Sequence, residues 1–560
     1  MNPHSLVKKK ELGAYYTPAE LSQVLANWAI ESSSDHILEP SFGGCGFFDS
    51  CISRLVNLGC NSPAKQLFGV DIDPLAFDIL SQKFGTILSI ENRFIQNDFI
   101  KVKPEDFITP TFDTIIGNPP YVSMHNMTET QRSSCEKILH NSPFSGQTIG
   151  RNASLWAFFL LHSLSFLKTS GRVAWVLPSS ALHADYAKKL IDIYKKHFDT
   201  IKIVKLAERY FRSEGAEETS VILVGSGFST TEVKICNFSV YSVDGISDLD
   251  IILKNGNEKN SHSDENYKLA FISTIIKDTY KQLNSSTFSY QLNDFIDIKI
   301  GMVTGANKIF IVNKEILEGN NIPASCVKPV IGRFSSLIGI RHTKSRQQMI
   351  ENHNHRVFLV NPSLEQMEAK DCNVKKYLSQ LPYSEILKNR TFKKRTYWFS
   401  PDDNIIPDGF LSYMIHLGPR LVINQAKVNC TNSIHRIFFR KKTTLKNKLA
   451  ISLTLLSTYS QFSAEVEGRA YSSGVLKIEP SAGKRIKILL NDHCINLLND
   501  VLKNVEHHIK NNELHIATKI IDKALIQSGL LTQVQCDVLS EGLLFLRKER
   551  YKGVRNFDEQ

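Results

Sequence analysis

The chain has 560 residues, of which 42% are hydrophobic and 22% charged, values typical of a globular protein with two or three domains. Its longest apolar run, from Trp156, is too short and too interrupted to span a membrane, and its polar first residues argue against a signal peptide, so we expect a cytoplasmic protein without membrane association. The net charge is +11. The ten cysteines show neither CxxC pairs nor Cys/His metal spacing, and this pattern argues against disulfides and a metal site.

The first predicted element is a helix that follows Thr17. Pro18 suits the first helical position and Glu20 the third, while Leu21 and Trp28 fall on one face. This pattern predicts that Thr17 caps the helix. A helix start also offers amides and a hydroxyl to a carboxylate, so Thr17 is a candidate for ligand binding as well.

A strand from Ile37 then leads into the glycine-rich turn SFGGCGFF, a pattern that lets the backbone approach a ligand closely. About 30 residues later a second strand, QLFGV, ends at Asp71, where an acid is suited to ribose hydroxyls. Asp73 is the competing acid, and its alternative role is to cap the next helix. A further short strand ends with Asp98 and Phe99, which by themselves are unremarkable.

The stretch FDTIIGNPPYV begins as a buried strand and changes abruptly after its glycine. Pro119 and Pro120 stiffen the backbone and remove two amide donors, so the segment continues as neither strand nor helix. The result is a rigid loop at the carboxyl edge of a sheet, where ligands bind in open α/β folds. Asn118 and Tyr121 are therefore candidate contacts. The alternative is a stiff turn in which both are incidental.

Further strands are predicted from Arg172, Ile201 and Thr219, so that residues from about 13 to 225 form a largely parallel α/β domain. The polar stretch from Gly245 is interpreted as a long surface excursion before a domain boundary near residues 270–290.

The second half of the chain has a different sequence pattern. From Asp297 it consists of short β-like pieces rich in Gly, Pro and Asn, and its last eighty or so residues return to helical periodicity. Residues 291–480 hold 27 Lys and Arg against 15 Asp and Glu, a net charge of +12 in a chain whose total is +11. This concentration of charge favours a domain that binds a polyanion.

Within this basic segment, the run FKKRTYWF combines cations with rings that are able to stack or wedge. Lys393, Lys394 and Arg395 are the candidate nucleic-acid contacts. The alternative is a solvated basic loop beside core aromatics, Tyr397 and Trp398.

Taken in order, GAYYTP, EPSFGGCGFF, GVDIDP, QNDF, GNPPYV and GRVAWVLPSSAL resemble the successive motifs of gamma-group DNA adenine-N6 methyltransferases from restriction-modification systems. The likeness to their catalytic domain covers about residues 10–225. It implies an α/β, Rossmann-like S-adenosylmethionine-dependent methyltransferase domain over residues 1–280. A mixed, β-containing DNA target-recognition domain over 281–485 and a helical C-terminal segment over 486–560 would follow.

The resemblance also implies S-adenosylmethionine as the cofactor and assigns its contacts. Thr17 would hold the methionine carboxylate, Asp71 the ribose, and Asp98 with Phe99 the adenine. The turn that surrounds the amino-acid moiety would contribute Glu39, Pro40, Ser41 and Gly43. Family members carry a glycine where this chain has Cys45, which puts the exact contacts of the turn and the affinity for the cofactor in question.

The exocyclic amine of adenine is a poor nucleophile because its lone pair is delocalised into the ring. The Asn118 side-chain oxygen and the Pro119 carbonyl would accept its hydrogens and favour a tetrahedral nitrogen, and Pro120 would help to hold them rigidly. Tyr121 would stack on an adenine flipped out of double-stranded DNA, with Phe211 as a second wall.

We therefore predict a site-specific adenine-N6 DNA methyltransferase, whose partner is double-stranded DNA and whose cognate restriction endonuclease would be a separate protein. Two alternatives stay open: methylation of RNA or of a protein glutamine, and a DNA-binding subunit that has lost turnover.

Overall fold

The computed structural model describes residues 17–85, 93–144, 148–182, 184–206, 220–243, 245–254, 267–270, 272–369, 372–440, 443–471 and 474–551. The chain divides into two compact units, the first extending to residue 271 and the second comprising Ile272–Tyr551. Among the described residues no helix combines the length and the apolar character needed to cross a bilayer. The predicted domain limits at residues 280 and 485 stay a prediction.

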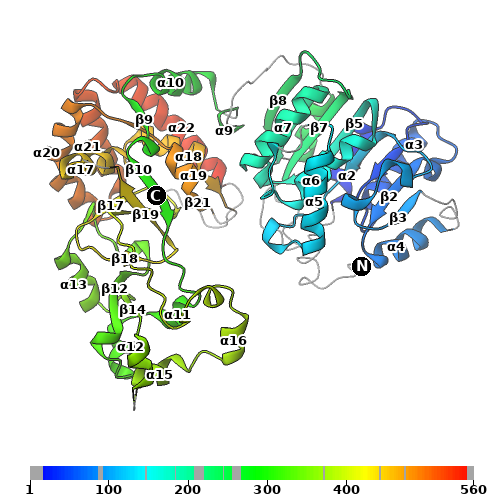
Figure 1. Ribbon diagram of the computed structural model, residues 1–560. Helices are drawn as coiled ribbons and strands as arrows, with labels where there is room; N and C mark the ends of the chain where they lie inside the picture. Colours follow the sequence, from blue (N-terminus) through cyan, green and yellow to red (C-terminus); the bar gives the residue numbers. More distant parts are fainter. Residues whose placement is uncertain are drawn as a thin grey trace. The chain divides into compact units, whose positions relative to one another are not determined.

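The first unit is built on an eight-stranded sheet with the order β3-β2-β1-β4-β5-β7-β6-β8 (Figure 1). Only β7 runs antiparallel to its neighbours, β5 and β6. The strands are β1 (Ile37–Glu39), β2 (Leu67–Asp71), β3 (Phe94–Gln96), β4 (Phe112–Gly117), β5 (Leu167–Pro178), β6 (Phe198–Leu206), β7 (Ser220–Phe228) and β8 (Asn237–Val243). The predicted α/β fold with a mostly parallel sheet is confirmed.

Helices cover both faces of this sheet and give two hydrophobic cores. α2 (Ala19–Ala29), α3 (Gly46–Asn57), α4 (Pro74–Phe84) and α8 (Ile246–Lys254) share one core, and α5 (Glu129–Asn141), α6 (Leu155–Ser163) and α7 (Asp185–His197) share the other. Ile115 of β4 packs into the second core and Ile116 into the first, as the alternation of a strand requires. Both faces of the sheet are thereby buried, which explains its continuous apolar strands.

The stretch after Gly245 corrects one prediction. It is not only a surface excursion, because Ile246–Lys254 forms α8, which buries Leu249 and Leu253 against the sheet and packs beside α2. The apolar spacing of four residues between these two leucines was the available signal.

The described part of the second unit combines four small sheets with helices. The two larger sheets have the orders β10-β19-β15-β17-β13 and β11-β14-β12-β18. The two smaller sheets are β16-β21-β20 and β22-β9, formed by β9 (Ser289–Gln291), β16 (Met414–Ile415), β20 (Arg469–Ala470), β21 (Leu476–Lys477) and β22 (Lys487–Leu489). The strands of the two larger sheets are β10 (Ile296–Ile300), β11 (Ile311–Val312), β12 (Val327–Ile331), β13 (Arg341–His342), β14 (Phe358–Val360), β15 (Gly409–Ser412), β17 (Leu421–Asn424), β18 (Asn429–Cys430) and β19 (Ile434–Phe439). Short helices in this part are α11 (Asn307–Phe310), α12 (Lys314–Gly319), α13 (Lys344–Asn352), α14 (Leu364–Glu368), α15 (Asn373–Leu378) and α16 (Tyr383–Lys388).

The remaining elements of this unit are mainly helical, as the periodicity of the final residues predicted. They are α10 (Thr274–Asn284), α17 (Leu445–Thr454), α18 (Thr458–Glu467), α19 (Pro480–Arg485), α20 (Asp492–Lys510), α21 (Leu514–Gln527) and α22 (Gln533–Tyr551). Ion pairs join α20 to β13 and α13: Glu506 of α20 accepts from Arg341 of β13 and Arg346 of α13, and these bonds lower its pKa to about 2 against the effect of burial.

Candidate active site

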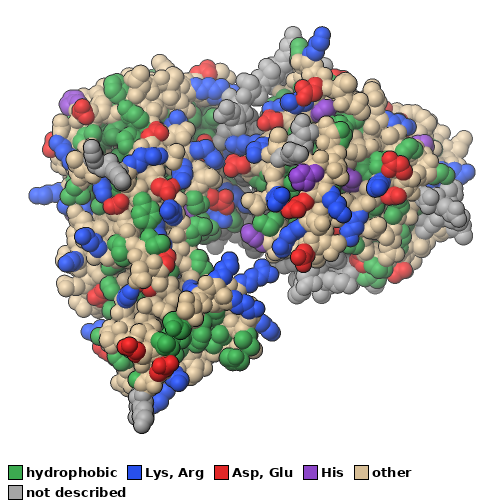
Figure 2. Space-filling model, viewed as in Figure 1, with side chains coloured by type: hydrophobic (Ala, Val, Ile, Leu, Met, Phe, Trp, Pro, Cys, Tyr) green, Lys and Arg blue, Asp and Glu red, His purple; other side chains and the backbone are tan. Residues whose placement is uncertain are grey.

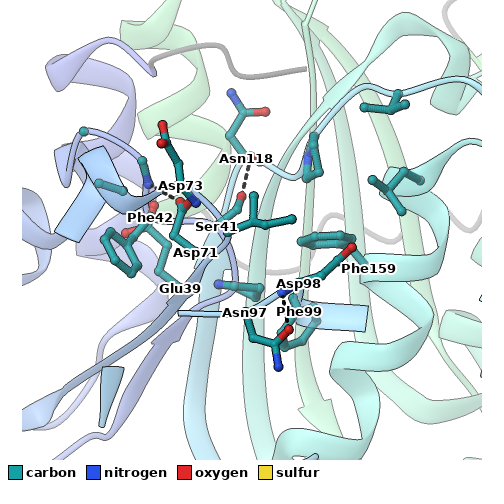
Figure 3. Close-up of a pocket in the computed structure, with 18 of the residues that line it drawn as sticks. Glu39, Ser41, Phe42, Asp71, Asp73, Asn97, Asp98, Phe99, Asn118 and Phe159 are labelled. Carbon is teal, nitrogen blue, oxygen red and sulfur yellow. Dashed lines mark hydrogen bonds between the residues drawn. The ribbon is translucent and has the colours of Figure 1, made fainter. Parts of the chain in front are cut away.

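A cavity of about 400 Å³ lies at the carboxyl ends of the strands in the first unit (Figure 3). In the sheet β1 lies between β2 and β4, so the chain leaves β1 on one side and later returns on the other. Such a switch point leaves a crevice beyond the strand ends, where ligands bind in open α/β sheets. The cavity is lined by all eight predicted cofactor contacts: Thr17, Glu39, Pro40, Ser41, Gly43, Asp71, Asp98 and Phe99.

The glycine-rich turn after β1 keeps a tight conformation despite its cysteine. Cys45 lies in the left-handed region, with φ 61° and ψ 23°, and its N–H donates to the Phe42 carbonyl at 2.7 Å. A side chain costs roughly 1–2 kcal/mol there, which is why glycine is the usual residue. Its buried thiol packs into the core, and burial raises its pKa. The turn therefore survives the departure from the family pattern, and the Cys45 backbone adopts a conformation typical of glycine.

Asp71 connects this turn to the end of β2. One oxygen of its buried carboxylate accepts from the Gly43 N–H at 2.8 Å, and the other accepts from the Asp73 N–H at 2.8 Å. Burial raises the pKa of Asp71, and these two amides oppose the rise. Asp73 caps α4 by accepting from the Leu75 N–H at 3.2 Å, so its predicted capping role is confirmed.

Glu39 is the most deeply buried acid of the cavity. Burial raises its pKa well above the ordinary range, and the charges of Asp71 and Asp49 raise it further. Within the described part of the chain its Oε2 has no hydrogen-bond partner. A buried carboxylate oxygen in this state is costly unless a ligand supplies a donor or a positive charge. The cavity therefore suits a ligand with a cationic group.

At the other end of the cavity, Asp98 and Phe99 follow β3. Asp98 Oδ1 accepts from the Ile100 N–H at 3.4 Å, and its Oδ2 accepts from Gln131 Nε2 at 3.4 Å; burial raises the pKa of this acid, and these bonds oppose the rise. Phe99 is buried and contacts the Phe159 ring at a centroid distance of 5.2 Å, so it serves the core as well as the cavity wall.

Thr17 does not cap α2, contrary to the prediction. The helix begins at Ala19, and its N-cap residue is Pro18, which has an extended backbone and no side-chain acceptor. The Thr17 hydroxyl instead accepts a hydrogen bond from Asn118 Nδ2 at 3.3 Å. Thr17 therefore joins the start of α2 to the loop that follows β4.

The NPPY loop contributes to the same cavity in part. Asn118 and Pro120 are among its lining residues, whereas the described lining includes neither Pro119 nor Tyr121. Ser41 Oγ donates to the Asn118 carbonyl at 3.2 Å, drawn as a dashed line in Figure 3. The Tyr121 hydroxyl donates to the Val176 carbonyl of β5 at 3.2 Å. Phe211, the predicted second wall, lies outside the described residues.

Gln131 is a cavity residue that the sequence analysis missed. It belongs to a capping box at the start of α5, where the Gln131 N–H donates to Thr128 Oγ1 at 3.1 Å and Gln131 Oε1 accepts from the Thr128 N–H at 3.1 Å. The sequence TETQ signals this box, but nothing in it indicates that the side-chain amide also reaches Asp98.

The three predicted nucleic-acid contacts lie in the second unit and differ from one another. Lys393 and Lys394 are exposed. The guanidinium of Arg395 is partly buried and donates to the carbonyls of Val303 and of Trp398, the latter at 3.3 Å. Arg395 therefore holds two loops together, which is compatible with DNA contact only through its remaining donors.

Comparisons with known proteins agree across most of the chain. Residues 1–279 match the family described as N-6 DNA Methylase, and residues 264–526 match the C-terminal domain of Type II methyltransferase M.Eco57I. Type II methyltransferase M.AccI of Acinetobacter calcoaceticus is 24% identical over 491 residues, which cover 85% of each chain. Type II methyltransferase M.XamI of Xanthomonas campestris pv. amaranthicola is 21% identical over 487 residues, again 85% of each chain.

Among solved structures, the Type IIL restriction-modification enzyme MmeI in complex with DNA has a TM-score of 0.54 at 12% identity, over 92% of this chain and 73% of MmeI. The ATP-dependent Type ISP restriction-modification enzyme LlaBIII bound to DNA has a TM-score of 0.50 at 11% identity, over 89% of this chain and 39% of LlaBIII. At these identities the likeness concerns the fold.

Proposed function

Because the chain belongs to the N-6 DNA methylase family of Type II restriction-modification methyltransferases, we propose that it transfers a methyl group from S-adenosylmethionine to the N6 of an adenine flipped out of double-stranded DNA. The observation that carries this proposal is the position of Asn118. It lines the same cavity as the buried acids Glu39, Asp71 and Asp98, so an amine held by the NPPY loop would lie beside a ligand held by those acids.

The cavity fits the cofactor by size and by charge. Its volume is within the range of small-molecule sites. When bound, S-adenosylmethionine supplies an electrophilic methyl group on a sulfonium. The Glu39 carboxylate, whose Oε2 has no partner among the described residues, would accept a hydrogen bond from the cofactor's ammonium group. The Thr17 hydroxyl, which accepts from Asn118, would donate to the methionine carboxylate, and Asp98 would accept from the adenine amine.

The ribose contact requires acceptor capacity that Asp71 retains. Each of its two oxygens accepts one backbone hydrogen bond, from Gly43 and from Asp73, and a carboxylate oxygen has two lone pairs. The same carboxylate is therefore able to hold the turn and to accept from ribose hydroxyls.

Activation of the amine falls to the NPPY loop. The Asn118 side-chain oxygen and the Pro119 carbonyl would accept the two N6 hydrogens, which favours the tetrahedral nitrogen that the methyl transfer requires. The bond from Asn118 Nδ2 to Thr17 sets the rotation of the side-chain amide, so its oxygen faces away from Thr17. Tyr121 would stack on the flipped base. Tyr121 lies between Pro120 and Val122, which both line the cavity, and is itself not among the described lining residues.

No covalent enzyme intermediate is needed in this scheme. Burial raises the pKa of Cys135 to about 12 and that of Cys45 further, so at neutral pH both are thiols and poor nucleophiles. This suits transfer to an exocyclic amine, which attacks the methyl group directly.

DNA is favoured as substrate over RNA or a protein glutamine because half of the chain is a second unit with a concentration of positive charge. Residues 291–480 carry a net charge of +12, and the fold neighbours MmeI and LlaBIII are described in complexes with DNA. We further propose that the chain acts on chromosomal DNA in the cytoplasm and that cutting belongs to a separate cognate endonuclease.

The proposal is tested with purified protein, methyl-labelled S-adenosylmethionine and unmethylated plasmid DNA, followed by digestion to nucleosides and mass spectrometry. We expect label in N6-methyladenine, and none with Asn118→Ala. Label in N4-methylcytosine would overturn the target base. Label in RNA or in a protein fraction, with none in DNA, would overturn the substrate. Cofactor binding without transfer to any of them would favour the non-catalytic alternative.

A further inference from the structure

α16 exposes apolar side chains that do not pack in a core. Tyr383 and Leu387 are one helical turn apart on the same face, and they are 73% and 53% exposed. Ile386 of the same helix is partly buried against the neighbouring core. One apolar residue therefore anchors α16, while two others remain in water. Figure 2 shows hydrophobic side chains gathered over α16, where single exposed apolar residues would be ordinary but a group indicates a contact surface.

The surroundings of this face are strongly basic. The segment Lys375–Arg395 contains seven Lys and Arg against one acid, Glu385, which gives a net charge of +6. Glu385 is about 200° around the helix from Tyr383, and so lies on the other side of α16. Lys388, Arg390, Lys393 and Lys394 are all exposed, and Figure 2 shows Lys and Arg side chains along the edge of the hydrophobic group.

The face is also held firmly. Asn389 Nδ2, directly after α16, donates to the Gly305 carbonyl at 3.1 Å, and Phe392 packs in the core, where its ring would contact a Cβ at Gly305. Arg395 donates to the Val303 carbonyl. The apolar pair therefore stands on a helix whose C-terminal end is braced, which lowers the entropic cost of inserting it into a partner.

We propose that Tyr383 and Leu387 form a wedge that inserts at a base step of the DNA duplex while Lys388, Arg390, Lys393 and Lys394 contact the flanking phosphates. This inference rests on the proposed function for its partner. An apolar wedge surrounded by cations has the composition that unstacks and kinks DNA, because the phosphates attract the cations and the opened step covers the apolar groups. A second copy of the chain would bring +6 against +6, which disfavours self-association through this face.

The test separates the wedge from its charges by the salt dependence of binding. The variant Tyr383→Ser/Leu387→Ser and the variant Lys393→Ala/Lys394→Ala are compared in the full chain on two labelled 30-base-pair duplexes, one with the sequence that the wild-type chain methylates in cells and one with scrambled sequence. Val534→Ser, which changes an apolar residue 72% exposed on α22, is the matched control.

We expect the wedge variant to bind the target duplex about tenfold more weakly with an unchanged slope of log K against log salt, and to bend it less by energy transfer between its ends. The lysine variant should lower that slope by about 2 in magnitude. Tyr383→Phe should retain wild-type affinity, because the ring and not the hydroxyl inserts.

The inference would be overturned if the wedge variant bound and bent the target duplex as the wild type does, or if its salt slope were smaller. It would also be overturned if the wild-type chain sedimented as a dimer and the wedge variant as a monomer. If no sequence is methylated in cells, the proposed function fails, and the scrambled duplex with the same variants still decides the wedge.

Discussion

The carboxylate of Asp71, at the end of β2, accepts a hydrogen bond from the backbone N–H of Gly43, in the turn after β1, at 2.8 Å. The bond ties two neighbouring strand ends together where the cavity opens. It also places a buried negative charge beside the turn, so the same side chain shapes the site and gives it its electrostatic preference for a cation.

Asp71→Asn should loosen this connection. The N–H of Gly43 and that of Asp73 each donate to a different oxygen of Asp71, and in asparagine one of these oxygens becomes an N–H₂ group that would face one of the two donors. We expect a loss of roughly 2 kcal/mol in the free energy of unfolding and at least tenfold weaker binding of S-adenosylhomocysteine. Chemical denaturation and titration calorimetry measure the two effects.

The matched control is Asp73→Asn, because Asn caps a helix about as well as Asp and α4 should keep its N-cap. Equal losses in the two variants would contradict a special role for Asp71.

The left-handed backbone at Cys45 predicts which of two small substitutions, glycine or alanine, gives the more stable protein. Cys45→Gly and Cys45→Ala both remove the buried sulfur, but only glycine adopts φ 61° without steric cost. We expect the glycine variant to be the more stable by about 1 kcal/mol in thermal or chemical denaturation. A more stable alanine variant would show that this turn does not hold the left-handed conformation.

Because the pKa of Glu39 is raised, we expect the stability of the protein and its affinity for the cofactor to change in opposite directions with pH. The folded pKa of Glu39 is raised, so the folded state holds its proton more tightly than the unfolded state does. Its contribution to the free energy of unfolding is therefore present below the ordinary glutamate pKa of about 4.3 and is lost as the pH rises through the folded pKa. Cofactor binding should instead tighten over that rise, because the ionised carboxylate attracts the ammonium group.

Glu39→Gln should flatten both trends. We expect the variant to gain stability relative to the wild type as the pH rises from 5 toward 8, and to bind S-adenosylhomocysteine with an affinity that changes little across this range. Parallel pH profiles of the two proteins, by denaturation and by calorimetry, would be inconsistent with a carboxylate that faces the ligand's cation.

Two substitutions of Tyr121 test the roles of its ring and of its hydroxyl separately. The hydroxyl donates to the Val176 carbonyl, so Tyr121→Phe should cost about 1 kcal/mol of stability and leave methyl transfer nearly unchanged. Tyr121→Ala should reduce single-turnover transfer at least tenfold while DNA affinity changes less than threefold, because the flipped base loses its stacking surface. If the phenylalanine variant loses transfer as severely as the alanine variant, the hydroxyl and its bond to β5 are what matter.

Much of the first unit followed from local pattern. The strands at Ile37 and Phe112 were predictable because each is a short apolar run bounded by turn residues. α8 was harder to predict: the four-residue spacing of Leu249 and Leu253 indicates a helix, but its Ser, Asp and Lys residues and the polar stretch after it favour an exposed segment. Thr17 shows the limit of capping rules: the sequence around it fits an N-cap, but the chain starts its helix one residue later and uses the hydroxyl for Asn118.

The site was predictable as a set of segments, and its internal bonds were not. Resemblance assigned Asp71 and Asp98 to the cofactor and Asn118 to the target base, and all three line one cavity. The bonds from Gln131 to Asp98 and from Gly43 to Asp71 join residues 33 and 28 positions apart. Such contacts depend on how the loops pack, which no single stretch of sequence encodes.

The most direct measurement is single-molecule sequencing of genomic DNA from a methylation-deficient host that expresses this chain, beside the same host with Asn118→Ala. The account predicts N6-methyladenine at one short recurrent sequence, and a loss of at least roughly 100-fold in the variant at equal protein level. The same modification with Asn118→Ala would contradict the proposed activation of the amine. Unmodified adenine with the wild-type chain, when the purified protein still binds S-adenosylmethionine, would contradict adenine in DNA as its target.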